Sequence, residues 1–193
     1  MSFLANKRLV IFGCGYVGTA LALEALSRGA NVSTLTRNAA RAIGLRERGI
    51  EAVVADLASG DWHERIARSP NLVVNCVSSG GGGIEGYRRS YLEGMASIVA
   101  WARGGGRIGT FVYTGSTSVY PQGGGAVVDE SAPTRGPELS ERARLLVETE
   151  DLLRTHAAAI CERWFVLRLA GIYGPGRHHF IDQVKAGETS GTG

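Results

Sequence analysis

The chain has 193 residues, of which 44% are hydrophobic and 20% charged, as is typical of a globular protein. Its formal net charge is +3, and its 21 lysines and arginines are spread along the sequence, which argues against a nucleic-acid-binding face. No apolar run approaches the roughly 18 residues of a membrane span, and the N-terminus lacks the apolar core of a signal peptide. We therefore expect a cytoplasmic protein that has neither nucleic acid nor a membrane as a partner.

Short apolar runs alternate with helical patterns along the chain. The apolar runs at residues 8–12, 32–36, 52–55, 71–77, 107–114 and 164–169 predict strands. Helices are predicted at residues 16–28, between the second strand and residue 48, at residues 84–102 and at residues 139–155. Such alternation is typical of a parallel sheet that helices cover on both faces. The sequence thus predicts a three-layer α/β domain with a doubly wound parallel sheet over residues 1–172.

A glycine-rich turn directly follows the first predicted strand. Gly13, Gly15 and Gly18 form the pattern G-x-G-x-x-G, and a helix begins inside it at Tyr16 and Val17. Gly13 permits a tight turn, Gly15 lets the backbone approach a pyrophosphate, and Gly18 lets the helix pack closely on the strand. The free N–H groups at the start of the helix can bind the phosphates. This context predicts a Rossmann fold that binds a dinucleotide, with a purely structural turn as the alternative.

The end of the second predicted strand indicates which dinucleotide is bound. NAD sites usually place Asp or Glu there for the ribose 2′-hydroxyl, whereas NADP sites place Arg nearby. No carboxylate lies between Glu24 and Glu47, and Thr36-Arg37 stands at the strand end. A guanidinium can bind a 2′-phosphate through two parallel hydrogen bonds. The sequence therefore favours NADP(H), with NAD as the alternative cofactor and a solvated Arg37 as the alternative role of this residue.

Two further features lie on the edge of the sheet where ligands bind, beyond the carboxyl ends of the strands. Cys76 and Val77 end the fourth predicted strand and are expected to line the cofactor site. The run Gly80–Gly83 follows them, and both a mobile flap and a linker without a role are open for it. Cys14, Cys76 and Cys161 lack metal-ligand spacing, so we expect reduced thiols and no metal site.

Several segments in order along the chain carry a family resemblance. Residues 114–120 (Thr-Gly-Ser-Thr-Ser-Val-Tyr) follow the fifth predicted strand, and residues 168–177 (Arg-Leu-Ala-Gly-Ile-Tyr-Gly-Pro-Gly-Arg) follow the sixth. With Asp56-Leu57 and Glu130–Pro133, they make the chain resemble the extended short-chain dehydrogenases/reductases, the NAD(P)-dependent epimerase/dehydratase family, in an atypical YeeZ-like branch. The resemblance implies an oxidoreductase or epimerase/dehydratase in which Asp56 and Leu57 flank the adenine. It implies a small-molecule substrate, with nucleotide sugars as one class, and leaves a homodimer open.

The resemblance also implies catalytic residues, and here the chain departs from the family. Ser116 corresponds to the catalytic Ser/Thr, but the usual Tyr-x-x-x-Lys pair is absent because the only lysines are Lys7 and Lys185. Alignment puts Ser140 at the tyrosine position and Arg144 at the lysine position, where Arg144 could still contact the cofactor ribose. An aliphatic hydroxyl is a poor proton carrier, and Ser140 is also a plausible helix N-cap. Tyr120 and Tyr173 are the alternative phenols, although packing over the cofactor is the simpler role for both.

The second departure is length. In the family the chain continues into a small substrate-binding domain, whereas here residues 173–193 are expected to be the stub of a largely missing domain, disordered at its end. Little turnover is therefore expected from this truncated chain, although the family resemblance favours an enzyme. The alternative function is a catalytically inert NADP(H)-binding sensor or regulatory protein.

Overall fold

The computed structural model describes residues 2–187, without the side chains of His179 and Phe180, and contains a six-stranded parallel sheet. The strand order is β3-β2-β1-β4-β5-β6, so the chain runs outward from β1 to one edge and then from β4 to the other. This order confirms the predicted doubly wound Rossmann sheet. The strands are β1 (Arg8–Phe12), β2 (Asn31–Thr36), β3 (Glu51–Val54), β4 (Leu72–Asn75), β5 (Ile108–Ser116) and β6 (Cys161–Leu169).

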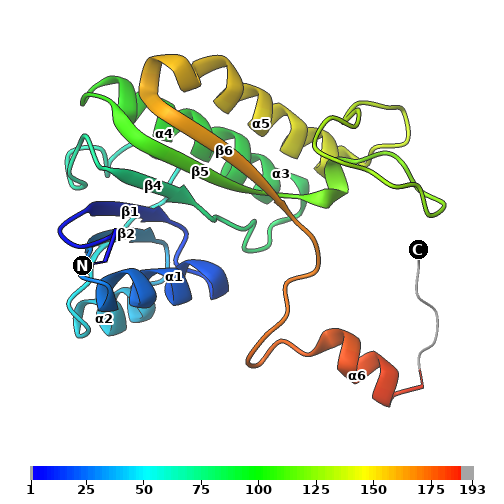
Figure 1. Ribbon diagram of the computed structural model, residues 1–193, viewed down its shortest axis with the longest axis horizontal. Helices are drawn as coiled ribbons and strands as arrows, with labels where there is room; N and C mark the ends of the chain where they lie inside the picture. Colours follow the sequence, from blue (N-terminus) through cyan, green and yellow to red (C-terminus); the bar gives the residue numbers. More distant parts are fainter. Residues whose placement is uncertain (1, 188–193) are drawn as a thin grey trace.

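Helices cover the sheet on both sides and complete the three layers (Figure 1). One side carries α1 (Tyr16–Ser27) and α2 (Ala39–Arg46), which pack on β1–β3. The other side carries α4 (Gly94–Arg103) and α5 (Glu141–Ile160). Successive side chains of β1 point to opposite faces of the sheet and so contribute to two hydrophobic cores. Leu9 and Ile11 belong to the first core, under α1 and α2, and Val10 and Phe12 belong to the second, under α4 and α5.

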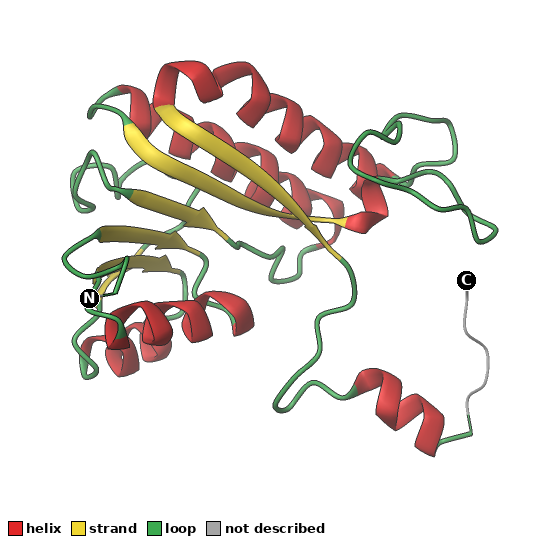
Figure 2. Cartoon of the chain, viewed as in Figure 1, coloured by secondary structure: helices red, strands yellow, loops and turns green. Residues whose placement is uncertain are grey.

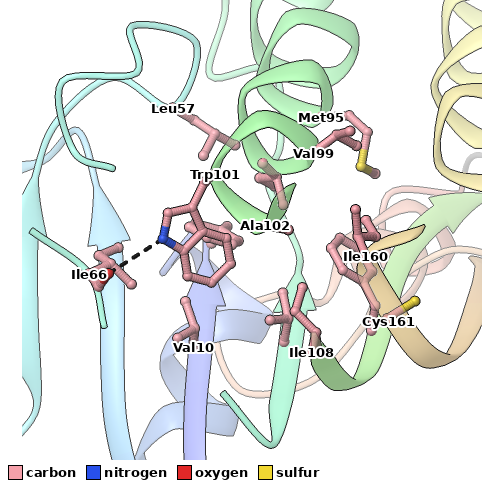
Figure 3. Packing of buried hydrophobic residues seen from close by; sticks show 14 of the residues in the cluster. Val10, Leu57, Ile66, Met95, Val99, Trp101, Ala102, Ile108, Ile160 and Cys161 are labelled. Carbon is pink, nitrogen blue, oxygen red and sulfur yellow. Dashed lines mark hydrogen bonds between the residues drawn. The ribbon is translucent and has the colours of Figure 1, made fainter. Parts of the chain in front are cut away.

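Three aromatic rings form the centre of the second core. The Phe12 ring centroid lies 5.0 Å from that of Trp62 and 5.6 Å from that of Trp101. The indole N–H of Trp101 donates to the carbonyl of Ile66 at 3.4 Å, as Figure 3 shows, and that of Trp62 donates to Leu57 at 2.9 Å. Because Leu57 follows β3, this packing fixes the loop that carries Asp56 at the ligand edge of the sheet.

The edge strand β6 is covered on one side more than on the other. Val166 packs against the core under α5, whereas Phe165 and Leu167 point to the opposite side and are 52% and 48% exposed. In Figure 2 the helices near β5 and β6 all lie on the α5 side of the sheet. An apolar strip therefore remains in contact with solvent along β6 in the part of the chain that the structure describes.

The structure departs from the predicted elements in several places. Helix α5 runs five residues beyond the predicted end at residue 155, and β6 begins three residues before the predicted start at residue 164. The helix predicted at residues 84–102 consists of α3 (Gly83–Arg88), a π-helix η1 (Arg89–Glu93) and α4. Strand β4 ends at Asn75 rather than at residue 77, because the chain there turns toward the glycine turn of β1. A helix that the sequence did not predict, α6 (His179–Lys185), stands apart from the sheet (Figure 1). Residues 188–193, for which disorder is predicted, lie outside the described residues.

None of the helices among residues 2–187 is long and apolar enough to cross a lipid bilayer.

Candidate functional site

The glycine turn between β1 and α1 requires glycine at two of its three motif positions. Gly13 has a φ of +91°, and a Cβ there would lie 2.7 Å from the backbone nitrogen of Val77. A Cβ on Gly18 would collide with the carbonyl oxygen of Gly13 and lie 3.1 Å from the Cys76 sulfur. These two glycines therefore hold α1 and the end of β4 close to the turn.

Gly15 has a different environment, which fits a bound phosphate group. A Cβ on Gly15 would meet no described atom within 4 Å, so the space beside it is open. Gly15 is also the N-cap of α1, and among residues 2–187 no side chain caps this helix. The N–H groups of the first turn thus remain available, and an anion at this place would also interact favourably with the helix dipole.

A cleft of about 220 Å³ opens from the glycine turn across the carboxyl ends of the first four strands. It brings together eight residues for which the sequence predicts cofactor contacts: Gly13, Gly15, Thr36, Arg37, Asp56, Leu57, Cys76 and Val77. The cleft also contains Arg41, which the sequence analysis missed and whose Nη1 donates to the carbonyl of Cys14 at 3.0 Å. Its spacing of four residues from Arg37, across the start of α2, is the signal that could have identified it.

The glycine run after β4 folds over Arg37. The Nη2 of Arg37 donates to the carbonyl of Ser79 at 3.3 Å, and a Cβ on Gly80 would collide with the same guanidinium. All four glycines of the run Gly80–Gly83 have positive φ values, which other residues rarely adopt. The run thus forms one wall of the cleft at the end of β2.

Asp56 forms the opposite wall through an ion pair. Its carboxylate accepts from the Nε of Arg89 in η1 at 2.8 Å and from the backbone N–H of Ala58 at 3.0 Å. Burial alone would raise the pKa of Asp56, but these two hydrogen bonds and the positive charges of Arg89 and Arg37 together outweigh it and hold the pKa below its usual value. The side chain therefore stays ionised at neutral pH.

A second cleft of about 220 Å³ continues the first one toward β5. The two clefts share Gly15, Cys76, Val77 and Ser78 as walls, so they form one groove along the ligand edge of the sheet. The second cleft is lined by the predicted residues Tyr16, Val17 and Ser116 and by residues that the sequence analysis did not assign, among them Tyr87, Tyr91, Thr114 and Arg177.

Ser116 stands at the end of β5, where its side chain faces the second cleft. Its Oγ accepts from the backbone N–H of Ser118 at 3.2 Å and from the Ser118 hydroxyl at 3.0 Å. Both contacts use Ser116 as an acceptor, so its own O–H remains able to donate. This is the donor that a substrate carbonyl or hydroxyl oxygen would need.

The other sequence-predicted catalytic residues do not line this groove. The Oγ of Ser140 accepts from the N–H of Ala143 at 3.2 Å, which makes Ser140 the N-cap of α5. Arg144 donates to the carbonyl of Pro137 at 3.1 Å and lines a separate hollow. The Tyr120 hydroxyl accepts from Arg168 at 2.8 Å, and Tyr173 is 82% exposed beside another hollow. Gly18 packs behind the turn rather than into the groove.

Two cysteines, Cys14 and Cys76, line the groove, and both keep an uncharged thiol. Burial raises the pKa of Cys14 to about 11 and that of Cys76 to about 12, so neither is a thiolate nucleophile at neutral pH. Among the residues that the structure describes, no group of three or more His, Cys, Asp or Glu is arranged to hold a metal ion.

Known proteins share this sequence pattern and fold. The sequence pattern of the NAD dependent epimerase/dehydratase family matches residues 9–187. The protein YeeZ of Escherichia coli K12 is 32% identical over 178 residues, which make up 89% of this chain and 61% of YeeZ. The chain thus spans less than two thirds of the length of this relative.

Solved structures show the same fold at lower sequence identity. MoeE5, solved in complex with UDP-glucose and NAD, has a TM-score of 0.73 and 22% identity over 88% of this chain and 56% of its own. A UDP-galactose 4-epimerase has a TM-score of 0.73 and 21% identity over 93% of this chain and 63% of its own. The family match extends from the start of β1 through α6, and on this basis the chain belongs to the NAD-dependent epimerase/dehydratase family.

Proposed function

We propose that this chain binds NADP(H) along the groove and takes part in oxidoreductase or epimerase/dehydratase chemistry on a small substrate. The observation that supports the cofactor most directly is the pair Arg37 and Arg41 in the first cleft, at the end of a β2 strand that carries no carboxylate. Two guanidiniums in this place suit the doubly charged 2′-phosphate of NADP(H). NAD is the alternative cofactor.

Each part of the groove would bind a different part of the cofactor. The open space at Gly15 and the free N–H groups of α1 suit the pyrophosphate, and Asp56 and Leu57 suit the adenine ribose and adenine. The nicotinamide, when bound, supplies or accepts a hydride. In the second cleft Ser116 would donate a hydrogen bond to the reacting oxygen of the substrate. Nucleotide sugars are the substrate class that we propose, because MoeE5, which has this fold, was solved with UDP-glucose.

A second function, cofactor binding without turnover, is favoured by the α5 N-terminus. Ser140, which stands where the family has its tyrosine, is engaged as a helix cap, and Arg144 points to a hollow outside the groove. A chain of this kind would sense the NADPH/NADP⁺ ratio and report it through a partner. Measurable NADPH oxidation with a carbonyl substrate would exclude this second function.

Isothermal titration calorimetry with NADPH and NADH tests the proposed cofactor. We expect tighter binding of NADPH, and we expect Arg37→Ala to remove most of the difference. A hydrogen bond to a charged group contributes about 1.5–3 kcal/mol, so the expected loss in NADPH affinity is roughly 10–150-fold. Arg48→Ala, at an exposed position after α2, is the matched control and should change neither affinity. Equal affinity of the unmodified chain for NADPH and NADH would contradict the proposal.

A further inference from the structure

The second cleft is lined by tyrosines that do not come from α5, the helix on which the family carries its catalytic tyrosine. Three tyrosines line it together with Ser116, namely Tyr16, Tyr87 and Tyr91. Tyr16 is already engaged, because its hydroxyl donates to the carbonyl of Pro175 at 3.0 Å and Arg177 lies 5.2 Å from its ring centroid. Tyr16 thus holds the loop after β6, which leaves Tyr87 and Tyr91 as candidates for a chemical role.

The other three tyrosines are held away from this cleft. Tyr113 is fully buried in the core, and the hydroxyl of Tyr120 is bound by Arg168, whose guanidinium also lies 4.9 Å from the ring centroid. Tyr173 is exposed beside a different hollow. None of the three is among the residues that line the cleft with Ser116.

Tyr87 and Tyr91 lie one helical turn apart at the junction of α3 and η1. Their ring centroids are 4.8 Å apart, and both half-buried residues pack against the small apolar cluster that Val119 forms with residues at the start of α5. Tyr91 lies within the π-helix, a feature that occurs frequently at functional sites. The pair thus stands between the catalytic-type serine and the helix from which the family presents its tyrosine.

The surroundings of the two phenols differ. Burial raises the pKa of Tyr91 to about 12. The adjacent Tyr87 also raises this pKa, whereas a hydrogen bond with the backbone of Ser79 lowers it. Tyr91 therefore keeps its proton. Tyr87 instead has Arg142, in the first turn of α5, with its guanidinium carbon 5.5 Å from the ring centroid. The Arg142 guanidinium thus lies over the face of the Tyr87 ring and links the ring to the first turn of α5.

We propose that Tyr87 is the catalytic residue that transfers the proton in this site, acting with Ser116 on the substrate oxygen in place of the tyrosine absent from α5. The assignment rests on the proposed function. With the cofactor bound, its nicotinamide would supply the hydride to the carbonyl carbon, and the Tyr87 O–H bond would break as its proton passes to the carbonyl oxygen. The product is a hydroxyl group, and the phenolate left on Tyr87 takes a proton from solvent. Ser116 donates a hydrogen bond to the same oxygen throughout.

Chemical acetylation tests the placement of Tyr87 without relying on turnover. The full chain is treated with N-acetylimidazole, which acetylates accessible phenols, with and without saturating NADPH, and each tyrosine is followed by mass spectrometry. We expect NADPH to protect Tyr87, whereas the exposed Tyr173 reacts equally in both conditions. Acetylation of Tyr87 that NADPH does not change, or no acetylation of Tyr87 at all, would overturn the assignment.

Single-turnover kinetics tests the role itself, because a slow reaction is still measurable in this format. NADPH oxidation by excess chain is followed with 9,10-phenanthrenequinone and with glyceraldehyde as carbonyl probes. We expect Tyr87→Phe to lower the rate about 10²–10⁴-fold, the usual contribution of a positioned acid, at unchanged NADPH affinity. The matched control is Tyr113→Phe, which removes a buried hydroxyl outside the cleft and should leave the rate unchanged.

Calorimetry on the same samples separates this assignment from the proposed function. If the unmodified chain does not bind NADPH, the proposed function fails and the assignment fails with it. If the chain binds NADPH, two results overturn the assignment of Tyr87 alone: no oxidation with either probe, or an undiminished rate in Tyr87→Phe.

Discussion

The two halves of the sheet build their parts of the groove in different ways. The half around β1–β3 offers the backbone at its centre, where glycines allow close approach and a helix N-terminus has no capping side chain, and adds Arg37, Arg41 and Asp56 from the segments that follow its strands. The half around β4–β6 offers side chains that come from separate segments, with Ser116 at the end of β5 and Tyr87 on α3. A backbone site depends on a local pattern, whereas a side-chain site depends on how distant segments pack.

The halves also differ in how completely they are covered. Along β1 every residue from Leu9 to Phe12 is buried, since helices lie on both sides of it. Along β6, Phe165 and Leu167 remain about half exposed at 52% and 48%. The dinucleotide half is therefore closed around its core, while the other half presents apolar surface that nothing in the described residues covers.

The largest expected effect is on the backbone site. Gly15→Val should weaken NADPH binding about 100-fold or more, because the side chain would take the space of the pyrophosphate and remove at least two hydrogen bonds of about 1.5–3 kcal/mol each. Gly15 has φ −81° and ψ −145°, a pair outside the usual α and β regions of non-glycine residues, so the fold of the variant is checked beside its affinity. Calorimetry measures the affinity and circular dichroism the fold. Retained affinity would mean that the phosphates bind elsewhere and that the glycine turn is not the phosphate site.

The next largest effect is on stability in the half around β4–β6, where a buried ion pair joins α5 to β6. Glu150 and Arg168 approach to 2.8 Å with side-chain exposures of 1% and 13%. Glu150→Gln should lower the free energy of unfolding by about 3–5 kcal/mol, because an unpaired charge is left in the interior. Urea denaturation measures this. The neighbouring Asp151→Asn, whose ion pairs are more exposed, should cost no more than about 1 kcal/mol. Equal effects at the two positions would show that the buried pair has no special role.

The smallest expected effect is on stability, at a glycine that lies outside the glycine turn. Gly44 lies inside α2, and a Cβ there would meet no described atom within 4 Å. Gly44→Ala should therefore raise the free energy of unfolding by about 0.5–1 kcal/mol, the usual difference between the two residues in a helix. The midpoint of thermal unfolding should rise and NADPH affinity should stay constant. A destabilised variant would indicate that α2 needs flexibility at this position.

Most of the cofactor end could be predicted from the sequence. The strand pattern of apolar runs gave the sheet, and the glycines together with Thr36 and Arg37 indicated a cleft that the structure indeed lines with these residues. These features are local, because each strand end and the turn that follows it lie within a few residues of each other. The π-helix η1 and helix α6 were not predictable in the same way, since η1 is a local change of hydrogen bonding inside a predicted helix and α6 has only 7 residues.

The sequence by itself determined the fold class and the glycine turn of this protein, since both follow from short-range spacing of apolar residues and glycines. Only the tertiary structure decided which hydroxyl groups face the groove. Ser140 and Arg144, which the sequence analysis put at the positions of the family's catalytic pair, turn to other partners, while Tyr87 and Arg41 reach the groove without a motif to mark them. The physical reason is that a side chain's direction depends on the packing of its helix against neighbours far away in the sequence. Such packing leaves little trace in any local pattern.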